Sequence, residues 1–248
     1  MTGRVVLVTG GMGGIGTAIC RRLAAAQGNV VAANCLPGYD RKDEWLAGLR
    51  AEGFHNIHAA EGDVADYDSA TAMVSHVEAS IGPVDILINN AGIVRDNVLR
   101  KMSVGEWLSV IDTNLNATFN VTRNVVEGMS ERGWGRIVNL SSVNGQRGQF
   151  GQTNYSAAKA GMHGFAMALA QEVVKKGVTV NSVSPGYVAT EMLRSMRPDV
   201  LEKIIAGIPM GRLATPEEIA SLVAYLVSEE AGYITGANIA INGGMYMS

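Results

Sequence analysis

The sequence has few cysteines, little charge and no long apolar run. Two of its 248 residues are cysteines, Cys20 and Cys35, which is too few for a disulfide framework or a cysteine-rich metal site. Charged residues make up 17% of the chain, and its formal net charge is -3. We therefore expect neither nucleic acid nor an acidic membrane as a partner.

No stretch of the chain reaches the roughly 18 consecutive apolar residues that would span a bilayer. Strand-like sequence begins at Arg4-Val-Val-Leu-Val8, without the charged and then apolar pattern of an export signal. We expect a cytoplasmic protein. The four histidines are His55, His58, His76 and His163, and none has a partner at metal-ligand spacing. No metal site is predicted.

Apolar runs of strand length alternate with helix-length segments from end to end. The runs lie at Val5–Val8, Val30–Ala33, Ile57–Ala60, Val84–Ile88, Arg136–Leu140, Val178–Val183 and Ile239–Ile241, and the helical segments at Ile15–Ala26, Arg41–Glu52, Asp68–Ile81, Val104–Ser130, Asn154–Lys176 and Pro216–Ser228. The runs are continuous rather than alternating, as in strands covered on both faces. The pattern predicts an α/β fold with a parallel, doubly wound sheet and helices on both faces. No repeat, low-complexity tract or linker interrupts it, so we expect one domain over residues 1–248.

The least regular stretch covers residues 189–213, between the sixth strand and the last helix. It is rich in methionine and contains Pro198 and Pro209. One interpretation is a flap that covers the substrate. The other is a surface helical excursion in which methionine fills gaps. The sequence leaves both open.

The first predicted strand ends in a glycine-rich turn that leads into a helix. Its candidate binding residues are Gly10, Gly11, Met12, Gly13, Gly14, Ile15 and Gly16. Glycines let the backbone approach a pyrophosphate, and the helix N-terminus supplies free N–H groups and positive potential. The turn therefore predicts dinucleotide binding. Gly11, Gly13 and Gly16 satisfy G-x-G-x-x-G, whereas Gly10, Gly14 and Gly16 satisfy G-x-x-x-G-x-G, and the residues alone do not choose between these registers.

The end of the second strand bears on the choice of cofactor. An acidic residue there would bind the adenosine 2′-hydroxyl of NAD, but Asn34 occupies the position, and Arg41-Lys42 follow within one loop. A neutral side chain with cations nearby suits a 2′-phosphate, so NADPH is favoured. NADH stays open, because Asp40 could pair with Arg41 or bind a ribose. Arg41-Lys42 could also be a solvated helix start.

Tyr155-Ser-Ala-Ala-Lys159 carries the candidate catalytic pair. In a helix, the spacing from i to i+4 puts both side chains on one face. A tyrosine with a pKa of about 10 is a poor acid or base at neutral pH, but a lysine ammonium roughly 4 Å away would lower that pKa by about one to three. Tyr155 could then exchange a proton with a carbonyl oxygen. Ser142 ends the fifth strand at the carboxyl edge, where open α/β sheets bind ligands, and its hydroxyl could hold the substrate oxygen. His163, one turn after Lys159, could face the same site, but we expect it to be structural.

Two asparagine motifs accompany this pair. Asn89-Asn90-Ala91-Gly92 ends the fourth strand at the same edge of the sheet. Asn114 falls in the middle of a predicted helix, an unusual place for a poor helix former. Taken alone, a mid-helix asparagine is explained equally well by a solvent-facing position.

Together these motifs resemble the short-chain dehydrogenase/reductase family over nearly the whole chain. The resemblance implies a seven-stranded Rossmann sheet, the G-x-x-x-G-x-G register and a proton relay in which Lys159 holds the nicotinamide ribose and Asn114 positions a water behind Lys159. The further cofactor contacts that it implies are Gly62, Asp63 and Val64 at the adenine, Asn90, Ala91, Gly92, Ile93 and Val94 along the cofactor, and Pro185, Gly186, Val188 and Thr190 at the nicotinamide end. It also implies a homotetramer with D2 symmetry. The apolar last helix and tail, Glu217–Val227 and Asn238–Ser248, would pack across its two-fold axes.

Within the family, the chain resembles the bacterial branch that reduces acetoacetyl-CoA for polyhydroxyalkanoate synthesis. The resemblance rests on four segments, namely Arg95–Met102, Gly133–Arg136, Asn144–Tyr155 and Pro185–Tyr187. It implies that Gln149, Phe150, Gln152 and Tyr187 contact the acyl group and the pantetheine arm, with Asp96 and Lys101 at the mouth. The segment Leu36–Asp40 departs from the cofactor loop of that branch.

Two alternatives to this substrate assignment stay open. One is a 3-oxoacyl-acyl-carrier-protein reductase, which has the same chemistry but usually lacks the Gln149-Phe150 pair. The other is a catalytically silent dinucleotide-binding subunit. Such proteins usually lose the tyrosine or the lysine, and this sequence keeps both Tyr155 and Lys159.

Overall fold

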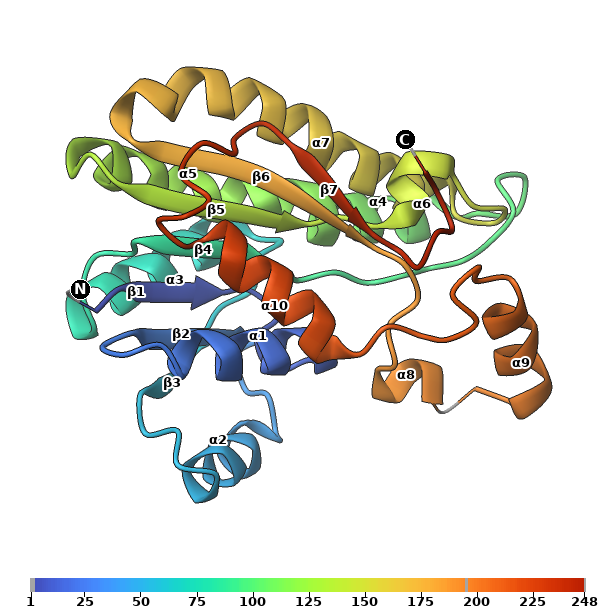
Figure 1. Cartoon of the computed structure of the whole chain (residues 1–248), viewed down its shortest axis with the longest axis horizontal. Coiled ribbons are helices and arrows are strands. Elements are labelled where there is room, and N and C mark those ends of the chain that lie inside the picture. The colour runs from blue at the N-terminus through green and yellow to red at the C-terminus, as the bar shows by residue number, and fades with distance from the viewer. Residues whose placement is uncertain (1–2, 195, 248) are drawn as a thin grey trace.

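A seven-stranded sheet forms the centre of the computed structural model, which describes residues 3–194 and 196–247 (Figure 1). Its strands are β1 (Val5–Val8), β2 (Val30–Cys35), β3 (Ile57–Glu61), β4 (Ile86–Asn89), β5 (Gly135–Leu140), β6 (Val178–Pro185) and β7 (Asn238–Ile241). They lie in the order β3-β2-β1-β4-β5-β6-β7, and every neighbouring pair is parallel. The predicted seven-stranded, doubly wound sheet is confirmed. Of the predicted single domain, positions 1, 2, 195 and 248 lie outside the described residues.

Helices cover both faces of this sheet (Figure 1). One face packs against α1 (Gly14–Ala24), α2 (Lys42–Ala51) and α10 (Pro216–Leu226), and the other against α3 (Tyr67–Ser80), α5 (Ala117–Glu131) and α7 (Thr153–Val173). In β1, Val6 and Val8 join the first core whereas Leu7 joins the second. Because successive side chains point to opposite faces and both faces are dry, the strands read as continuous apolar runs.

The long predicted helix Val104–Ser130 is three elements. It consists of α4 (Val104–Ile111), a π-helical turn η1 (Asp112–Asn116) and α5. A capping box starts α4, since the Ser103 side chain accepts from the Glu106 backbone and the Glu106 side chain accepts from the Ser103 backbone. The π-turn contains Asn114, and such turns are frequent at functional sites. A pattern of period 3.6 does not reveal one inserted residue, so the sequence predicts a single helix here.

A polar row crosses the sheet close to its carboxyl edge. Asn89, Asn139, Ser182 and Asn238 are register partners in β4, β5, β6 and β7. The Asn89 amide donates to the Asn139 side-chain oxygen at 2.9 Å and to the Thr122 hydroxyl at 3.1 Å. If one strand slipped by one residue against its neighbour, these polar side chains would lose their partners and face apolar ones. The row therefore fixes the register of the strands at the carboxyl edge, where the candidate site lies.

Short elements make up the rest of the described chain. These are α6 (Val143–Arg147), the 3-10 turn η2 (Val174–Lys176), α8 (Glu191–Arg194) and α9 (Pro198–Ala206). Helices α8 and α9 stand outside the layers of the sandwich (Figure 1). A bridge between Val188 and Ala214 closes the base of this excursion, with hydrogen bonds from Ala189 N to Ala214 O and from Ala214 N to Tyr187 O. The segment between Val188 and Ala214 therefore leaves the sheet and returns to it at the same place.

Candidate active site

The candidate catalytic side chains come from the end of β5 and the start of α7. Ser142 follows β5 by two residues and caps α6, where its hydroxyl accepts from the Asn144 backbone at 3.1 Å. Tyr155 and Lys159 lie one turn apart on α7, and the Lys159 ammonium is 5.7 Å from the centre of the Tyr155 ring. The structure thus brings together the serine, tyrosine and lysine that the sequence predicts to act together.

Lys159 is buried, with 3% of its surface exposed. Its Nζ donates to the Leu140 carbonyl, the last of β5, at 2.6 Å. Burial without a carboxylate partner disfavours the charged form and lowers the pKa of Lys159 to about 8. The position of the ammonium is therefore fixed by the end of the strand as well as by its own helix.

The pKa of Tyr155 shifts opposite to the direction that the sequence predicts. Burial raises this pKa, a hydrogen bond with Ser142 opposes the rise, and the Asp96 carboxylate adds to it. The prediction relied on a lysine directed at the tyrosine, but the Lys159 Nζ is directed at Leu140. The desolvation of Tyr155 therefore outweighs the lowering that Ser142 contributes, and Lys159 is not among the causes of the shift.

Asn114 braces the segment that follows β4. It is fully buried in the π-turn. Its side-chain oxygen accepts from the Ile93 backbone N–H at 2.8 Å, and its amide donates to the Ile93 carbonyl at 2.8 Å. Both ends of the amide are therefore used on the segment after β4, and the alternative of a solvent-facing asparagine is wrong. The role of this residue in positioning a water stays a prediction.

The glycine-rich turn is compact enough to carry a phosphate. A Cβ on Gly16 would lie 2.3 Å from the Gly10 carbonyl oxygen, and Gly10 itself has a φ of +59°. A Cβ on Gly13 would meet only that same carbonyl oxygen, at an ordinary 3.5 Å, whereas one on Gly14 would press on Thr190 at 3.0 Å. A Cβ on Gly11 would also be crowded, at 2.8 Å from the Ala33 Cβ, so the two spacings differ at Gly13, which has room for a side chain, and G-x-x-x-G-x-G is the one whose three glycines all lack that room.

The N-terminus of α1 is open for a ligand. No side chain caps it at Gly13, so the first backbone N–H groups of the helix are available to an anion. Asn90 secures the turn from behind, since its amide donates to the Thr9 and Gly10 carbonyls at 2.9 and 3.0 Å. A Cβ on Gly92 would lie 2.7 Å from the Asn114 side-chain oxygen and 3.5 Å from the Lys159 Nζ. The residues present thus fit a dinucleotide that runs from this turn towards Lys159.

The other predicted cofactor residues lie along the same edge. Gly62, Asp63 and Val64 follow β3, and the Asp63 carboxylate accepts from the Ala65 N–H at 2.9 Å. Gly186 follows β6, where a Cβ would lie 2.9 Å from the backbone of Asn242. Val188 is buried in the bridge to Ala214. Met12, Ile15, Ala91, Val94, Pro185 and Thr190 complete the predicted set, and their contacts with a cofactor stay predictions.

Asn34 and Arg41 occupy different environments. The Asn34 side chain is 3% exposed; its oxygen accepts from the Gly10 N–H, and its amide donates to carbonyls that include those of Ala60 and Gly62. It braces the turn from inside the sheet instead of facing outwards. Arg41 is exposed just before α2 and has no side-chain hydrogen bond or ion pair within the residues that the structure describes.

Two of the predicted substrate residues, Gln152 and Asp96, are joined by hydrogen bonds, and the others lie apart from them. The Gln152 amide donates to both oxygens of Asp96 at 3.0 Å, and its carbonyl accepts from Asn144 at 2.9 Å. Because Asn144 also donates its backbone N–H to the Ser142 hydroxyl, these hydrogen bonds link Asp96 to the candidate catalytic serine. The Asn144 side-chain oxygen is buried with no hydrogen-bond partner in the described part of the chain.

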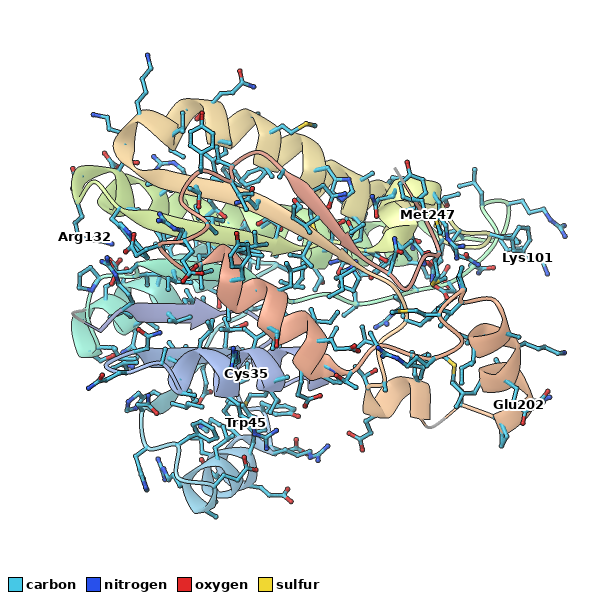
Figure 2. The ribbon with its side chains drawn as sticks, in the orientation of Figure 1. Cys35, Trp45, Lys101, Arg132, Glu202 and Met247 are labelled. Atoms are coloured by element: carbon cyan, nitrogen blue, oxygen red, sulfur yellow. The ribbon has the colours of Figure 1, made fainter. Side chains whose placement is uncertain are left out.

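The remaining substrate residues are not in this chain of contacts. Phe150 is 87% exposed, and Gln149 contacts Arg147 at 3.4 Å. Lys101 lies at the same end of the molecule as Met247 (Figure 2). Tyr187 lines a cavity of about 140 Å³ together with Ile208 and Met210. The walls of this cavity include none of the predicted catalytic residues, so the role of Tyr187 in acyl binding stays a prediction.

Two polar residues near the site were not predicted as part of it. Asn154 is fully buried directly before Tyr155, and its amide donates to the Arg95 and Glu106 carbonyls, which ties the start of α7 to the loop after β4. His163 shares a hydrogen bond with Ser141 at 2.7 Å, and the Ser141 hydroxyl donates to the Lys159 carbonyl. Burial and the nearby Lys159 charge lower the pKa of His163. These contacts agree with the structural role expected for His163.

No helix of the described residues combines the length and apolarity that a membrane crossing requires. Across positions 3–194 and 196–247, no three side chains of His, Cys, Asp or Glu gather as a metal site would need.

Comparison with known proteins identifies one family and several relatives that match over the full chain. The family model of short chain dehydrogenases matches residues 4–201. An acetoacetyl-CoA reductase of Cupriavidus necator is 61% identical over 247 residues, which cover 100% of both chains. A second acetoacetyl-CoA reductase, from Allochromatium vinosum, is 57% identical and covers 98% of this chain and 99% of its own. A 3-oxoacyl-acyl-carrier-protein reductase of Pseudomonas aeruginosa is 43% identical, covering 100% of this chain and 99% of its own.

Proposed function

The chain belongs to the short-chain dehydrogenase family, and on that premise we propose that it reduces acetoacetyl-CoA to (R)-3-hydroxybutyryl-CoA with a reduced nicotinamide cofactor. The observation that carries the proposal is the placement of Ser142, Tyr155 and Lys159 around the carboxyl end of β5. The substrate follows from two relatives that are more than half identical over almost the whole chain and bear that activity in their names.

Tyr155 acts as the general acid in this proposal. Ser142 is close enough to Tyr155 to oppose the rise of its pKa, and a carbonyl oxygen that accepted from both hydroxyls would be held where negative charge develops on it. A raised pKa keeps Tyr155 protonated until that charge appears. The bound nicotinamide supplies the hydride and, once oxidised, a positive charge. Lys159 holds a cation close to Tyr155, which favours the tyrosinate left after proton transfer.

NADPH is the proposed cofactor, although NADH fits the same glycine turn. Support for NADPH comes from Arg41, whose guanidinium is exposed and free for a 2′-phosphate in the described structure. Asn34 does not provide the carboxylate that would select a ribose hydroxyl. Arg41 is therefore the cation to which we assign the contact with the 2′-phosphate.

Coenzyme A rather than acyl carrier protein is proposed as the acyl carrier. Gln152 and Asp96 would order the mouth of the site, with Lys101, Gln149, Phe150 and Tyr187 as further contacts. The alternative carrier is supported by the relative from Pseudomonas aeruginosa, at the lower identity of 43%. The two proposals share the same reduction of a 3-oxoacyl group and differ only in the carrier to which that group is attached.

We also propose a homotetramer that works in the cytoplasm and supplies polyhydroxyalkanoate synthesis. Apolar side chains on the helical surface support assembly, since Val104 and Leu108 on α4 and Phe119 on α5 are at least 49% exposed. Phe119 stacks on Tyr67 of α3, with ring centres 6.2 Å apart. Burial of such a surface against a second copy is favourable.

The test is a comparison of carriers. The rate constant kcat/KM is measured for the same acetoacetyl group on coenzyme A and on acyl carrier protein, by following the loss of reduced nicotinamide absorbance. We expect a preference for coenzyme A and an (R) product by chiral chromatography. A large preference for acyl carrier protein would instead assign this protein to fatty acid synthesis. No turnover with either carrier would overturn the proposal.

A further inference from the structure

An ion pair fastens the loop that follows β2. Lys42, the first residue of α2, places its Nζ 2.5 Å from one oxygen of Glu61, the last residue of β3. The other oxygen of Glu61 accepts from the backbone N–H of Gly38 at 3.0 Å. One carboxylate therefore binds both the turn of the loop and the lysine at its end. The hydrogen bond between the two groups lowers the pKa of Glu61 and raises the pKa of Lys42, so both are charged at neutral pH.

This pair lies on the adenosine side of the dinucleotide site. Glu61 is the register partner of Cys35, the last residue of β2. The Asn34 carbonyl, one residue earlier, accepts from the N–H of Gly11 in the phosphate turn. In a doubly wound sheet the adenosine half of a dinucleotide extends from the first strand over the ends of the second and third. The loop tied down by Glu61 is therefore the segment that would meet the ribose.

The two cations that follow β2 are not equivalent. Lys42 is neutralised by Glu61, whereas Arg41 has no ion pair within the described residues. A 2′-phosphate would carry up to two negative charges next to this loop. It would meet one free guanidinium and, beside it, a carboxylate that both holds the lysine and repels the phosphate. A ribose hydroxyl is uncharged, so the Glu61 carboxylate would not repel it.

We propose that Glu61 is a specificity-determining residue that weakens the preference for NADPH over NADH by keeping Lys42 from the 2′-phosphate. The proposal rests on the proposed use of a nicotinamide dinucleotide. It places the discrimination in the balance between a cation on the loop and an anion on the neighbouring strand.

The test uses Glu61→Gln, which keeps an oxygen that can accept from Gly38 but releases Lys42. Dissociation constants of NADP⁺ and NAD⁺ are measured by calorimetry without substrate, so that binding is read apart from turnover. We expect the affinity ratio in favour of NADP⁺ to rise by about threefold to fivefold, as for one partly exposed charge pair, and to lose most of that gain in about 1 M salt. Lys42→Met, which leaves the carboxylate unpaired, should shift the ratio towards NAD⁺.

A matched control is Glu52→Gln, which breaks another exposed pair, between Glu52 and Arg21 on α1, and should leave the ratio unchanged. An unchanged ratio in Glu61→Gln, or an equal change in Glu52→Gln, overturns the role of Glu61. Failure of the proposed use of a nicotinamide dinucleotide looks different, because the unsubstituted protein would then bind neither nucleotide, whereas failure of the proposed acyl substrate would leave both dissociation constants measurable.

Discussion

Replacing Lys159 by methionine should stabilise the fold at neutral pH while removing activity. Burial lowers the pKa of Lys159 from the usual 10.5 to about 8. One pKa unit corresponds to about 1.4 kcal/mol, so the charged form costs the folded state about 3 kcal/mol. Methionine removes that cost but leaves the Leu140 carbonyl without its donor, which costs about 1–2 kcal/mol. We expect Lys159→Met to raise the free energy of unfolding by about 1–2 kcal/mol at pH 7.

The dependence on pH provides the decisive measurement. Below pH 8 both the folded and the unfolded states bind the lysine proton, so the full cost is present. Between pH 8 and 10.5 the unfolded state binds more protons than the folded state, and the stability contributed by this group rises with pH. The advantage of Lys159→Met should therefore disappear over that range in urea unfolding at fixed protein concentration.

Lys175→Met serves as the control, because Lys175 is exposed just beyond α7 and its replacement should give no comparable trend. A stability difference between Lys159→Met and the unsubstituted protein that stays constant from pH 7 to about 10.5 would refute the assignment of a costly buried charge.

Four further predictions follow from the geometry. Tyr155→Phe should lower kcat by about 10²–10⁴-fold while calorimetry shows unchanged cofactor binding; a near-normal kcat would place the proton donor elsewhere. Gly16→Ala should cost more than about 2 kcal/mol in unfolding free energy because its Cβ would strike the Gly10 carbonyl, whereas Gly13→Ala should change stability by less than about 1 kcal/mol, and similar losses in both would contradict the proposed register. Arg41→Ala should raise KM for NADPH more than KM for NADH, and equal increases would show that the guanidinium does not bind the 2′-phosphate. Light scattering at micromolar concentration should give a tetramer mass; a monomer would exclude the proposed assembly.

The sequence predicts the sheet well because one physical cause acts on every strand. Both faces are dry, so each strand appears as an apolar run, and the order of runs and helices fixes the topology. It also predicts that the candidate catalytic residues meet at one edge of the sheet, whereas their catalytic roles stay predictions. Tyr155 and Lys159 are separated by one helical turn, and Ser142 ends a strand, so local geometry alone brings them to the same edge.

What the sequence does not predict depends on partners far away in the chain. The direction of the Lys159 ammonium is set by Leu140, at the end of another element. The charge of Lys42, at the start of α2, is neutralised by Glu61, which lies nineteen residues later at the end of β3. Asn34 has the position expected for a cofactor-reading residue, but its amide is used inside the sheet. In each case the residue is identifiable from its pattern, whereas the hydrogen bond that decides its role is tertiary.

The closed base of the excursion between Val188 and Ala214 makes that segment exchangeable. Because the bridge and its hydrogen bonds fix both ends, a longer or shorter insert that keeps Arg212, which is paired with Glu218 of α10, would leave β6 and α10 in place. The entropy of closing a loop grows only slowly with length, by about 0.6 kcal/mol for each doubling. Residues 191–213 can therefore be regarded as an insertion that could be replaced by another segment with Arg212 retained. Inserts of other lengths grafted at the Val188–Ala214 junction should fold without a change in the strand order, and if the segment is a substrate flap they would change the acyl groups that are accepted.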